Sequence, residues 1–298
     1  LNPATEEIFA RVTNSDSRDV NKAVESAERA FTDWRALSLD ARADYLLKLA
    51  ELILENIDEL AIAETTDNGK PIKLSRTVDI PRAAYNFSFF AEHAKDFKSL
   101  RFDAKDMHSR VYHEALGAVA IISPWNLPLY LLTWKIAPAL IMGNTVVAKP
   151  SEFTPYTAFL LCKLIKKAGI PDGVINIIHG QGPRVGETLC THPSIKAVSF
   201  TGSTATGRMI NQYCAPHFKK VSLEMGGKNA AIIYADCDYE KTLDDVMRSA
   251  FSNQGQICLC NSRLYIEEAI YHKFKNDLIE RAKSLKVGDP LLESTDQG

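Results

Sequence analysis

The chain has 298 residues, of which 46% are hydrophobic and 24% charged, and its formal net charge is −2. This composition is typical of a globular protein with one large domain or two ordinary ones. The 35 basic residues are balanced by 37 acidic ones and form no long basic block, which argues against nucleic acid as a partner. The seven histidines are scattered without metal-ligand spacing, so no metal site is predicted.

Membrane and secretory segments are not expected. The longest apolar run, residues 127–143, contains Lys135 and two prolines, which favours a packed core segment over a membrane span. The first residues, LNPATEE, are not a signal peptide, because no apolar stretch follows a basic start. Six cysteines in so long a chain do not form a dense disulfide framework, so we expect reduced thiols and a cytoplasmic protein.

The first part of the chain is predicted to be helical. Apolar residues recur there at three- and four-residue steps, as on one face of a helix, and Ser17 and Asp40 are the expected caps of the first two helices. Alternating residues after a polar region then predict a strand. The predicted elements are helices over 17–36, 40–64 and about 77–96, and a strand over 109–117.

From residue 118 short apolar runs alternate with helix-sized segments. This pattern predicts a parallel sheet covered by helices on both faces, which is the doubly wound, Rossmann-like α/β architecture. The predicted strands are 118–123, 144–150, 173–180, 195–202 and 219–227, and the helices between them are 128–142, 154–168, 183–191 and 204–213. A second α/β module follows after about residue 225, with strands at 230–236 and 263–268 and helices at 239–252 and about 269–284.

Ligands of such sheets bind beyond the carboxyl ends of the strands, and two motifs there could contact a nucleotide. In FTGSTATG (200–207), glycines lead into a helix start, where free N–H groups suit a pyrophosphate. The Gly-x4-Gly spacing is not the dinucleotide fingerprint, so by itself this motif favours a plain turn. In AKPSE (148–152), Glu152 could accept hydrogen bonds from ribose hydroxyls and repel a 2′-phosphate. Alternatively, it could form a solvated ion pair with Lys149.

Two further strand-end residues could act on a carbonyl substrate. Asn126, in ISPWNLP, could donate its amide hydrogen to a developing oxyanion, or could simply form a turn. Glu224 precedes two glycines in SLEMGGK. It could serve as a general base, or it could be a surface residue at the end of a strand.

The segment SNQGQICLCN (252–261) holds Cys258 and Cys260. A nucleophilic thiolate needs a lowered pKa or a nearby base, together with access for the electrophile. A free cysteine is more often a small buried apolar residue. That interpretation is the one given to the other cysteines, Cys162, Cys190, Cys214 and Cys237.

The order of these motifs is more informative than any one of them. PWN, KPSE, FTGST, LEMGGK and NQGQIC follow one another on the expected elements, and together they closely resemble the NAD(P)-dependent aldehyde dehydrogenase superfamily. The resemblance runs from NPATEE to VGDP, essentially the whole chain. The finer pattern, including GPRVGE and CLCNSR, is similar to the branch of 2-aminomuconic and 2-hydroxymuconic semialdehyde dehydrogenases.

The resemblance implies a chemical role for each matching residue. Cys258 matches the nucleophile that attacks the aldehyde, Asn126 matches the oxyanion donor, and Glu224 matches the base that activates water. Arg82, in DIPR, matches an arginine that holds a substrate carboxylate, although an exposed helix arginine is an equal alternative. NAD is the implied cofactor. The residues that match its contacts are Trp125, Lys149, Pro150, Ser151, Glu152, Gly202, Ser203 and Gly226.

The resemblance also implies an organisation in two domains. Residues 1–225 would form the NAD-binding domain, with an oligomerisation strand segment at about 106–117, and residues 226–298 the first part of a catalytic domain. Members of the superfamily carry further segments before and after the matched region. We therefore expect this chain to be a fragment that turns over aldehyde poorly, from a protein that forms a homodimer or homotetramer.

Two alternatives to an enzyme that oxidises a small, carboxylated semialdehyde stay open. One is a general aliphatic or betaine-type aldehyde dehydrogenase. The other is a non-catalytic nucleotide-binding scaffold. The presence of Asn126, Glu224 and Cys258 argues against the scaffold, which would need none of them.

Overall fold

The computed structural model describes residues 1–298, and a parallel five-stranded sheet forms its centre. The strand order is β5-β4-β3-β6-β7, and every neighbouring pair is parallel. This confirms the predicted doubly wound α/β sheet. The strands are β3 (Ala118–Ile122), β4 (Thr145–Lys149), β5 (Ile175–Ile177), β6 (Ile195–Gly202) and β7 (Lys220–Met225).

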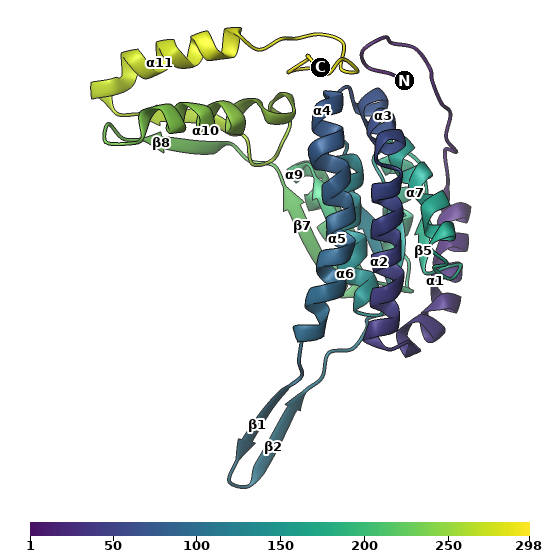
Figure 1. The fold of residues 1–298 in the computed structure, drawn as a ribbon. Helices are drawn as coiled ribbons and strands as arrows, with labels where there is room; N and C mark the ends of the chain where they lie inside the picture. The colour runs from purple at the N-terminus through teal and green to yellow at the C-terminus, as the bar shows by residue number, and fades with distance from the viewer.

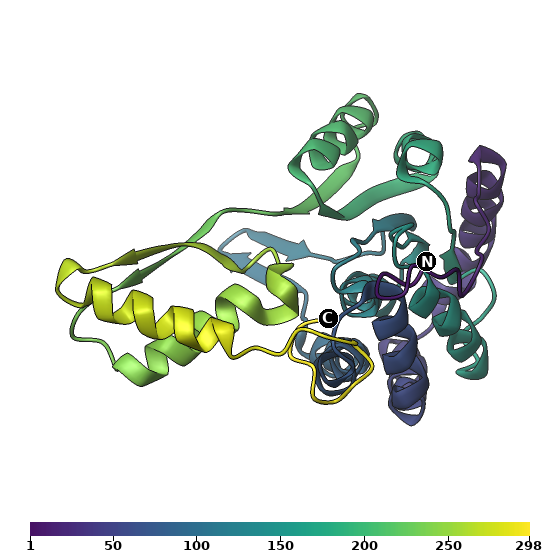
Figure 2. The ribbon, with the colours of Figure 1, turned by 90° about the horizontal axis from the view of Figure 1, so that it is seen from above.

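Helices cover both faces of this sheet (Figure 2), because its central strands are apolar on both sides. Along β3, Val119 and Ile121 enter the larger core, whereas Ala118 and Ala120 enter the smaller one. The larger core is formed with α2 (Leu39–Glu55), α5 (Ile80–His93), α6 (Pro128–Ile141) and α7 (Tyr156–Lys167). The smaller core is formed with α1 (Ser17–Ala36), α8 (Gly182–Thr191) and α9 (Thr204–Cys214).

The first two helices begin at other caps than predicted. Asp16, not Ser17, caps α1, because its carboxylate accepts the Arg18 N–H at 2.9 Å and starts a capping box. Ser38, not Asp40, caps α2, since its hydroxyl oxygen accepts the Ala41 N–H at 3.1 Å.

The single helix predicted over 40–64 is wrong. The chain breaks at Asn56, whose side-chain amide donates to the Leu52 carbonyl at 2.6 Å, and α3 (Ile57–Asn68) follows. The helix predicted over about 77–96 begins earlier, at Ile72. It consists of α4 (Ile72–Leu74), the π-helical turn η1 (Ser75–Asp79), α5 and the short η2 (Ala94–Asp96).

A hairpin of β1 (Leu100–Ala104) and β2 (Met107–Val111) projects away from the body of the molecule (Figure 1). The strand predicted over 109–117 is therefore wrong in its bounds, and β1 was not predicted. All five residues of β1 are exposed, so the alternation of buried and exposed residues that marks a half-buried strand is absent there.

The last part of the chain forms a separate arm beside the main body (Figure 1). Its two parallel strands carry two helices over a small core of Ile233, Leu243, Val246 and Phe274. The elements of the arm are β8 (Asn229–Ile233), α10 (Tyr239–Phe251), η4 (Ser252–Gly255), β9 (Asn261–Ile266) and α11 (Glu268–Lys283). The short helix η3 (Ala215–His217) belongs to the main body and precedes β7. None of the helices combines the length and apolar character needed to cross a bilayer.

Candidate active site

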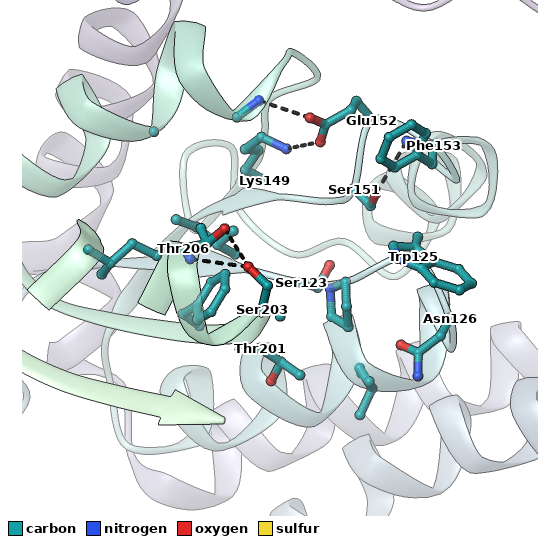
Figure 3. Close-up of a pocket in the computed structure, with 18 of the residues that line it drawn as sticks. Ser123, Trp125, Asn126, Lys149, Ser151, Glu152, Phe153, Thr201, Ser203 and Thr206 are labelled. Atoms are coloured by element: carbon teal, nitrogen blue, oxygen red, sulfur yellow. Dashed lines mark hydrogen bonds and ion pairs between the residues drawn. The ribbon is translucent and has the colours of Figure 1, made fainter. Parts of the chain in front are cut away.

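A cleft of about 620 Å³ lies at the carboxyl ends of the strands, where the strand order reverses between β3 and β6 (Figure 3). Chain connections leave this point in opposite directions, which is why ligands of doubly wound sheets bind there. The cleft is lined by Ile122, Ser123, Pro124, Trp125, Asn126, Leu131, Lys149, Ser151, Glu152, Phe153, Gly182, Pro183, Gly186, Glu187, Phe200, Thr201, Gly202, Ser203, Thr206, Met209, Ile210, Tyr213, Gly255, Gln256, Ile257 and Cys258.

The end of β4 supplies an ion pair on the wall of the cleft. The buried Lys149 ammonium donates to Glu152 Oε2 at 2.9 Å, and the other Glu152 oxygen accepts the Gly182 N–H at 3.1 Å (Figure 3). Partial burial acts to raise the pKa of Glu152, but hydrogen bonds from backbone N–H groups and Lys149 outweigh it, so its pKa lies below the usual value. Glu152 is therefore an ionised acceptor at neutral pH.

The turn between β6 and α9 brings a helix N-terminus to the cleft. Ser203 caps α9, and its hydroxyl oxygen accepts the Thr206 N–H at 3.1 Å (Figure 3). At Gly202 a Cβ atom would meet the Phe200 ring at 2.4 Å, and at Gly207 it would meet Met225 Sδ at 2.8 Å. The buried Phe200 ring leaves no room for a side chain at Gly202, whereas the exposed Met225 side chain could move aside at Gly207.

The loop after β3 is fixed through its backbone carbonyls. The Trp125 carbonyl accepts hydrogen bonds from Asn68 and Thr154, at 2.8 and 3.2 Å. The Asn126 carbonyl accepts two more, from Lys70 Nζ and Asn253 Nδ2, each at 3.0 Å. These hydrogen bonds fix the Asn126 backbone, and with it the position from which the Asn126 side-chain amide reaches the cleft.

The cysteine loop reaches the same cleft through an unusual backbone turn. Asn253, Gln254 and Gly255 have φ values of 50°, 55° and 71°, in the left-handed region that non-glycine residues seldom adopt. The loop that follows places Cys258 on the cleft wall, exposed, with its N–H free of partners in the chain. Asn126 Nδ2 donates to the Gln256 carbonyl at 2.7 Å, which ties the two loops together.

The structure separates other predicted residues from the cleft wall. Glu224 is exposed on the edge strand β7, opposite Thr201 of β6, and does not line the cleft. Neither Pro150 nor Gly226 lines it. Of the three predicted catalytic residues, Asn126 and Cys258 therefore share the cleft, whereas Glu224 lies one strand away from it.

Arg82 also lies outside the cleft, on α5. Its guanidinium is surrounded by the rings of Tyr85, Tyr130 and Trp134, at 5.1, 5.7 and 5.4 Å from the ring centroids. Arg82 Nε is buried without a hydrogen-bond partner in the chain. Cation–π contacts of this kind hold the guanidinium plane in a fixed place.

A model of the aldehyde dehydrogenase family matches residues 1–298. The chain belongs to the aldehyde dehydrogenase family. It is 49% identical to the 2-aminomuconic semialdehyde dehydrogenase of Danio rerio, over 100% of this chain and 62% of the relative. It is 47% identical to the protein of that name in Homo sapiens, over 97% of this chain and 61% of the relative. The chain thus spans about three-fifths of the length of these curated relatives.

Solved structures of aldehyde dehydrogenases share the fold. A putative aldehyde dehydrogenase from Burkholderia cenocepacia superposes with a TM-score of 0.98 at 38% identity, over 100% of this chain and 61% of its own. PnpE, solved in complex with nicotinamide adenine dinucleotide, superposes with a TM-score of 0.97 at 38% identity, over 100% of this chain and 61% of its own. A structure of PnpE is from Pseudomonas sp. WBC-3.

Some residues that line or support the cleft were not predicted from the sequence. Asn253 is 3% exposed and joins the cysteine loop to Asn126, and the only local signal was its place in an Asn-Gln-Gly run. Lys70 follows an Asn-Gly turn and gave no sign of reaching Asn126, 56 residues away. Phe153, 72% exposed beside Glu152, lines the cleft and was not singled out either.

Proposed function

We propose that this chain forms the cofactor cleft and carries the nucleophile of an NAD-dependent dehydrogenase that oxidises a carboxylated semialdehyde to the corresponding acid. The observation that carries the proposal is the meeting of Cys258 and Asn126 in one cleft at the strand-order reversal. The names of the relatives, 2-aminomuconic and 2-hydroxymuconic semialdehyde dehydrogenase, support the substrate class.

The residues of the cleft fit NAD. The N-terminus of α9 offers free N–H groups to a pyrophosphate, next to Gly202 and Ser203. Glu152, held ionised by Lys149 and Gly182, suits the hydroxyls of a ribose and would repel a 2′-phosphate. Trp125 and Ser151, which line the cleft, also belong to the proposed set, and Pro150 and Gly226 complete it on the strength of the family alone. When bound, NAD supplies the two-electron oxidant for the reaction.

The chain's own groups divide the remaining work. The Cys258 thiolate attacks the aldehyde carbonyl carbon and gives a thiohemiacetal, whose oxidation leaves a thioester on the sulfur. The oxyanion lies between the Cys258 N–H and the Asn126 amide, which has a second hydrogen beyond the one donated to Gln256. Glu224 takes a proton from water, and that water hydrolyses the thioester. A rotation of its side chain must bring Glu224 from the edge strand to the cleft.

Arg82 is the proposed partner of the substrate carboxylate. Its unpartnered, buried Nε and its fixed guanidinium plane are suited to bidentate recognition of a carboxylate. Arg82→Ala should raise KM for carboxylated aldehydes and leave turnover of neutral ones unchanged. An unchanged KM for both kinds of aldehyde would favour a general aliphatic dehydrogenase, and an equal loss on both would remove Arg82 from the substrate site.

The test of the reaction uses the longest natural form of the protein that contains this chain. Aldehyde-dependent NADH formation should be lost in Cys258→Ala and kept in Cys260→Ala. Cys260 is a matched control, since it lies two residues further on and its thiol faces the Ser252 carbonyl at 3.8 Å. Equal loss in the two variants, or full activity in Cys258→Ala, would contradict the assignment of the nucleophile.

Three further proposals concern the whole protein. The division into residues 1–225 and 226–298 is supported by the end of the main sheet at Met225 and the start of a separate sheet at Asn229. A homodimer or homotetramer is supported by apolar side chains exposed on the projecting hairpin, Leu100, Phe102 and Met107. A cytoplasmic location is supported by six free cysteines.

A further inference from the structure

Lys70 is a buried charge outside the cleft. Its side chain is 0% exposed, and its three ammonium hydrogens meet three acceptors. These are Glu64 Oε1 at 3.4 Å, a short contact to Asp79 Oδ2, and the Asn126 carbonyl at 3.0 Å. Two of the acceptors are buried carboxylates of the helical bundle, and the third belongs to the loop that carries the proposed oxyanion donor.

The cluster is built around a charge that burial makes costly. A buried ammonium is tolerated only where its hydrogens are fully paired. Glu64 is 0% exposed, and burial raises its pKa to about 7; burial also raises the pKa of Asp79, while the Lys70 ammonium acts to lower both. Hydrophobic residues of the same volume often serve as well or better for stability alone, so such a cluster is weak evidence for a stabilising role.

The Asn126 carbonyl is where the charge cluster meets the cysteine loop. It accepts hydrogen bonds from the Lys70 ammonium and the Asn253 side-chain amide. The Asn126 side-chain amide in turn donates a hydrogen bond to the Gln256 carbonyl. A charge-assisted hydrogen bond is roughly twice as strong as a neutral one, so Lys70 contributes strongly to holding this peptide group in place. Asn253 adopts a left-handed backbone and is 3% exposed, which makes the loop dependent on its partners.

We propose that Lys70 is a positioning residue of the reaction, which acts through the Asn126 main chain to hold the oxyanion donor in register with Cys258. The inference rests on the proposed function, because it assigns Asn126 the same part in the reaction. If so, removing the Lys70 ammonium displaces the Asn126 side-chain amide, although Lys70 contacts only the main-chain carbonyl of Asn126. Misplacement of a reacting group by about 1 Å costs on the order of 100-fold in rate.

The experiment compares kinetics in a double-mutant cycle. Lys70→Met alone would leave two unpaired carboxylates, so the main variant is Lys70→Met with Glu64→Gln and Asp79→Asn, which keeps the volume and removes all charge. In the longest natural form of the protein, this variant should lower kcat about 10- to 100-fold, with KM for the aldehyde changed less than about threefold. In an Asn126→Ala background the same three changes should lower kcat less than about threefold.

Thr65→Val is the matched control. It removes a buried hydrogen bond between hydroxyls of the same bundle, Thr65 Oγ1 and Ser75 Oγ at 2.8 Å, and touches nothing in the cleft. Its kcat should equal that of the unchanged protein. An unchanged kcat in the folded triple variant would overturn the proposal. So would an equal loss of kcat when the three changes are made in the unchanged protein and in the Asn126→Ala background.

Hydrogen exchange gives a second readout that does not depend on turnover. In the triple variant, amides of residues 123–127 and 252–258 should exchange faster, while those of β4 keep their rates. If the unchanged protein forms no NADH, the proposed function is at fault and exchange alone decides the matter. Faster exchange confined to the two loops then supports the positioning by Lys70, and unchanged exchange refutes it.

Discussion

Glu64→Gln should remove a pH dependence of stability that burial builds into the fold. Burial raises the pKa of Glu64 from 4.5 to about 7. Between these values the folded state binds a proton that the unfolded state has lost, so the free energy of unfolding falls as pH rises. A difference of one proton corresponds to about 1.4 kcal/mol per pH unit. The stability advantage of the variant should therefore be less than about 1 kcal/mol near pH 5 and roughly 3 kcal/mol near pH 8.

Urea denaturation at one-unit intervals from pH 5 to pH 8 measures this difference. Histidines titrate in the same window in both proteins, so the comparison uses the difference between them at each pH. Asp67→Asn is the control: burial raises the pKa of Asp67 from 3.8 to about 6, so its effect on stability should level off above about pH 6, whereas that of Glu64→Gln should keep growing up to about pH 7. Parallel curves for the unchanged protein and Glu64→Gln would refute the reasoning.

Three other substitutions test separate contacts. Gly202→Ala places a Cβ 2.4 Å from the Phe200 ring and should cost about 1–3 kcal/mol in urea denaturation; Gly186→Ala, with open space around its Cβ, should cost nothing, and equal losses would contradict the packing argument. Trp34→Phe removes the indole donor to the Leu140 carbonyl at 3.1 Å and should cost about 1 kcal/mol, so an unchanged midpoint would argue against this bond. Glu152→Gln should reduce the preference for NAD over NADP about tenfold, on the order of 1.4 kcal/mol, and an unchanged preference would remove Glu152 from the ribose site.

The parallel sheet could be predicted because its strands are buried on both faces. Runs such as residues 118–123 and 144–150 are largely apolar, and their alternation with helix-sized segments is typical of a parallel sheet covered on both faces. The hairpin strand β1 could not be found in the same way, since all its side chains are exposed. The break at Asn56 depends on one side-chain hydrogen bond inside an otherwise continuous apolar stripe, so periodicity passes over it.

The residues of the candidate site also differ in how well the sequence predicts them. Residues at or shortly after the carboxyl ends of strands, such as Asn126, Lys149 and Ser203, could be placed at the cleft from topology. Lys70 and Asn253 could not, because their partners lie 56 and 127 residues away along the chain. A buried lysine also has the same sequence signature as a solvated one, and only the folded chain distinguishes them.

In the proposed reaction the Cys258 sulfur carries the acyl group. Intact-mass spectrometry of a Glu224→Gln variant, in the longest natural form of the protein and mixed with NAD and the semialdehyde, tests it most directly. We expect one acyl adduct per chain, located by peptide mapping on Cys258, with one equivalent of NADH formed. NADH formed without any adduct on Cys258, or an adduct on another cysteine, would contradict it.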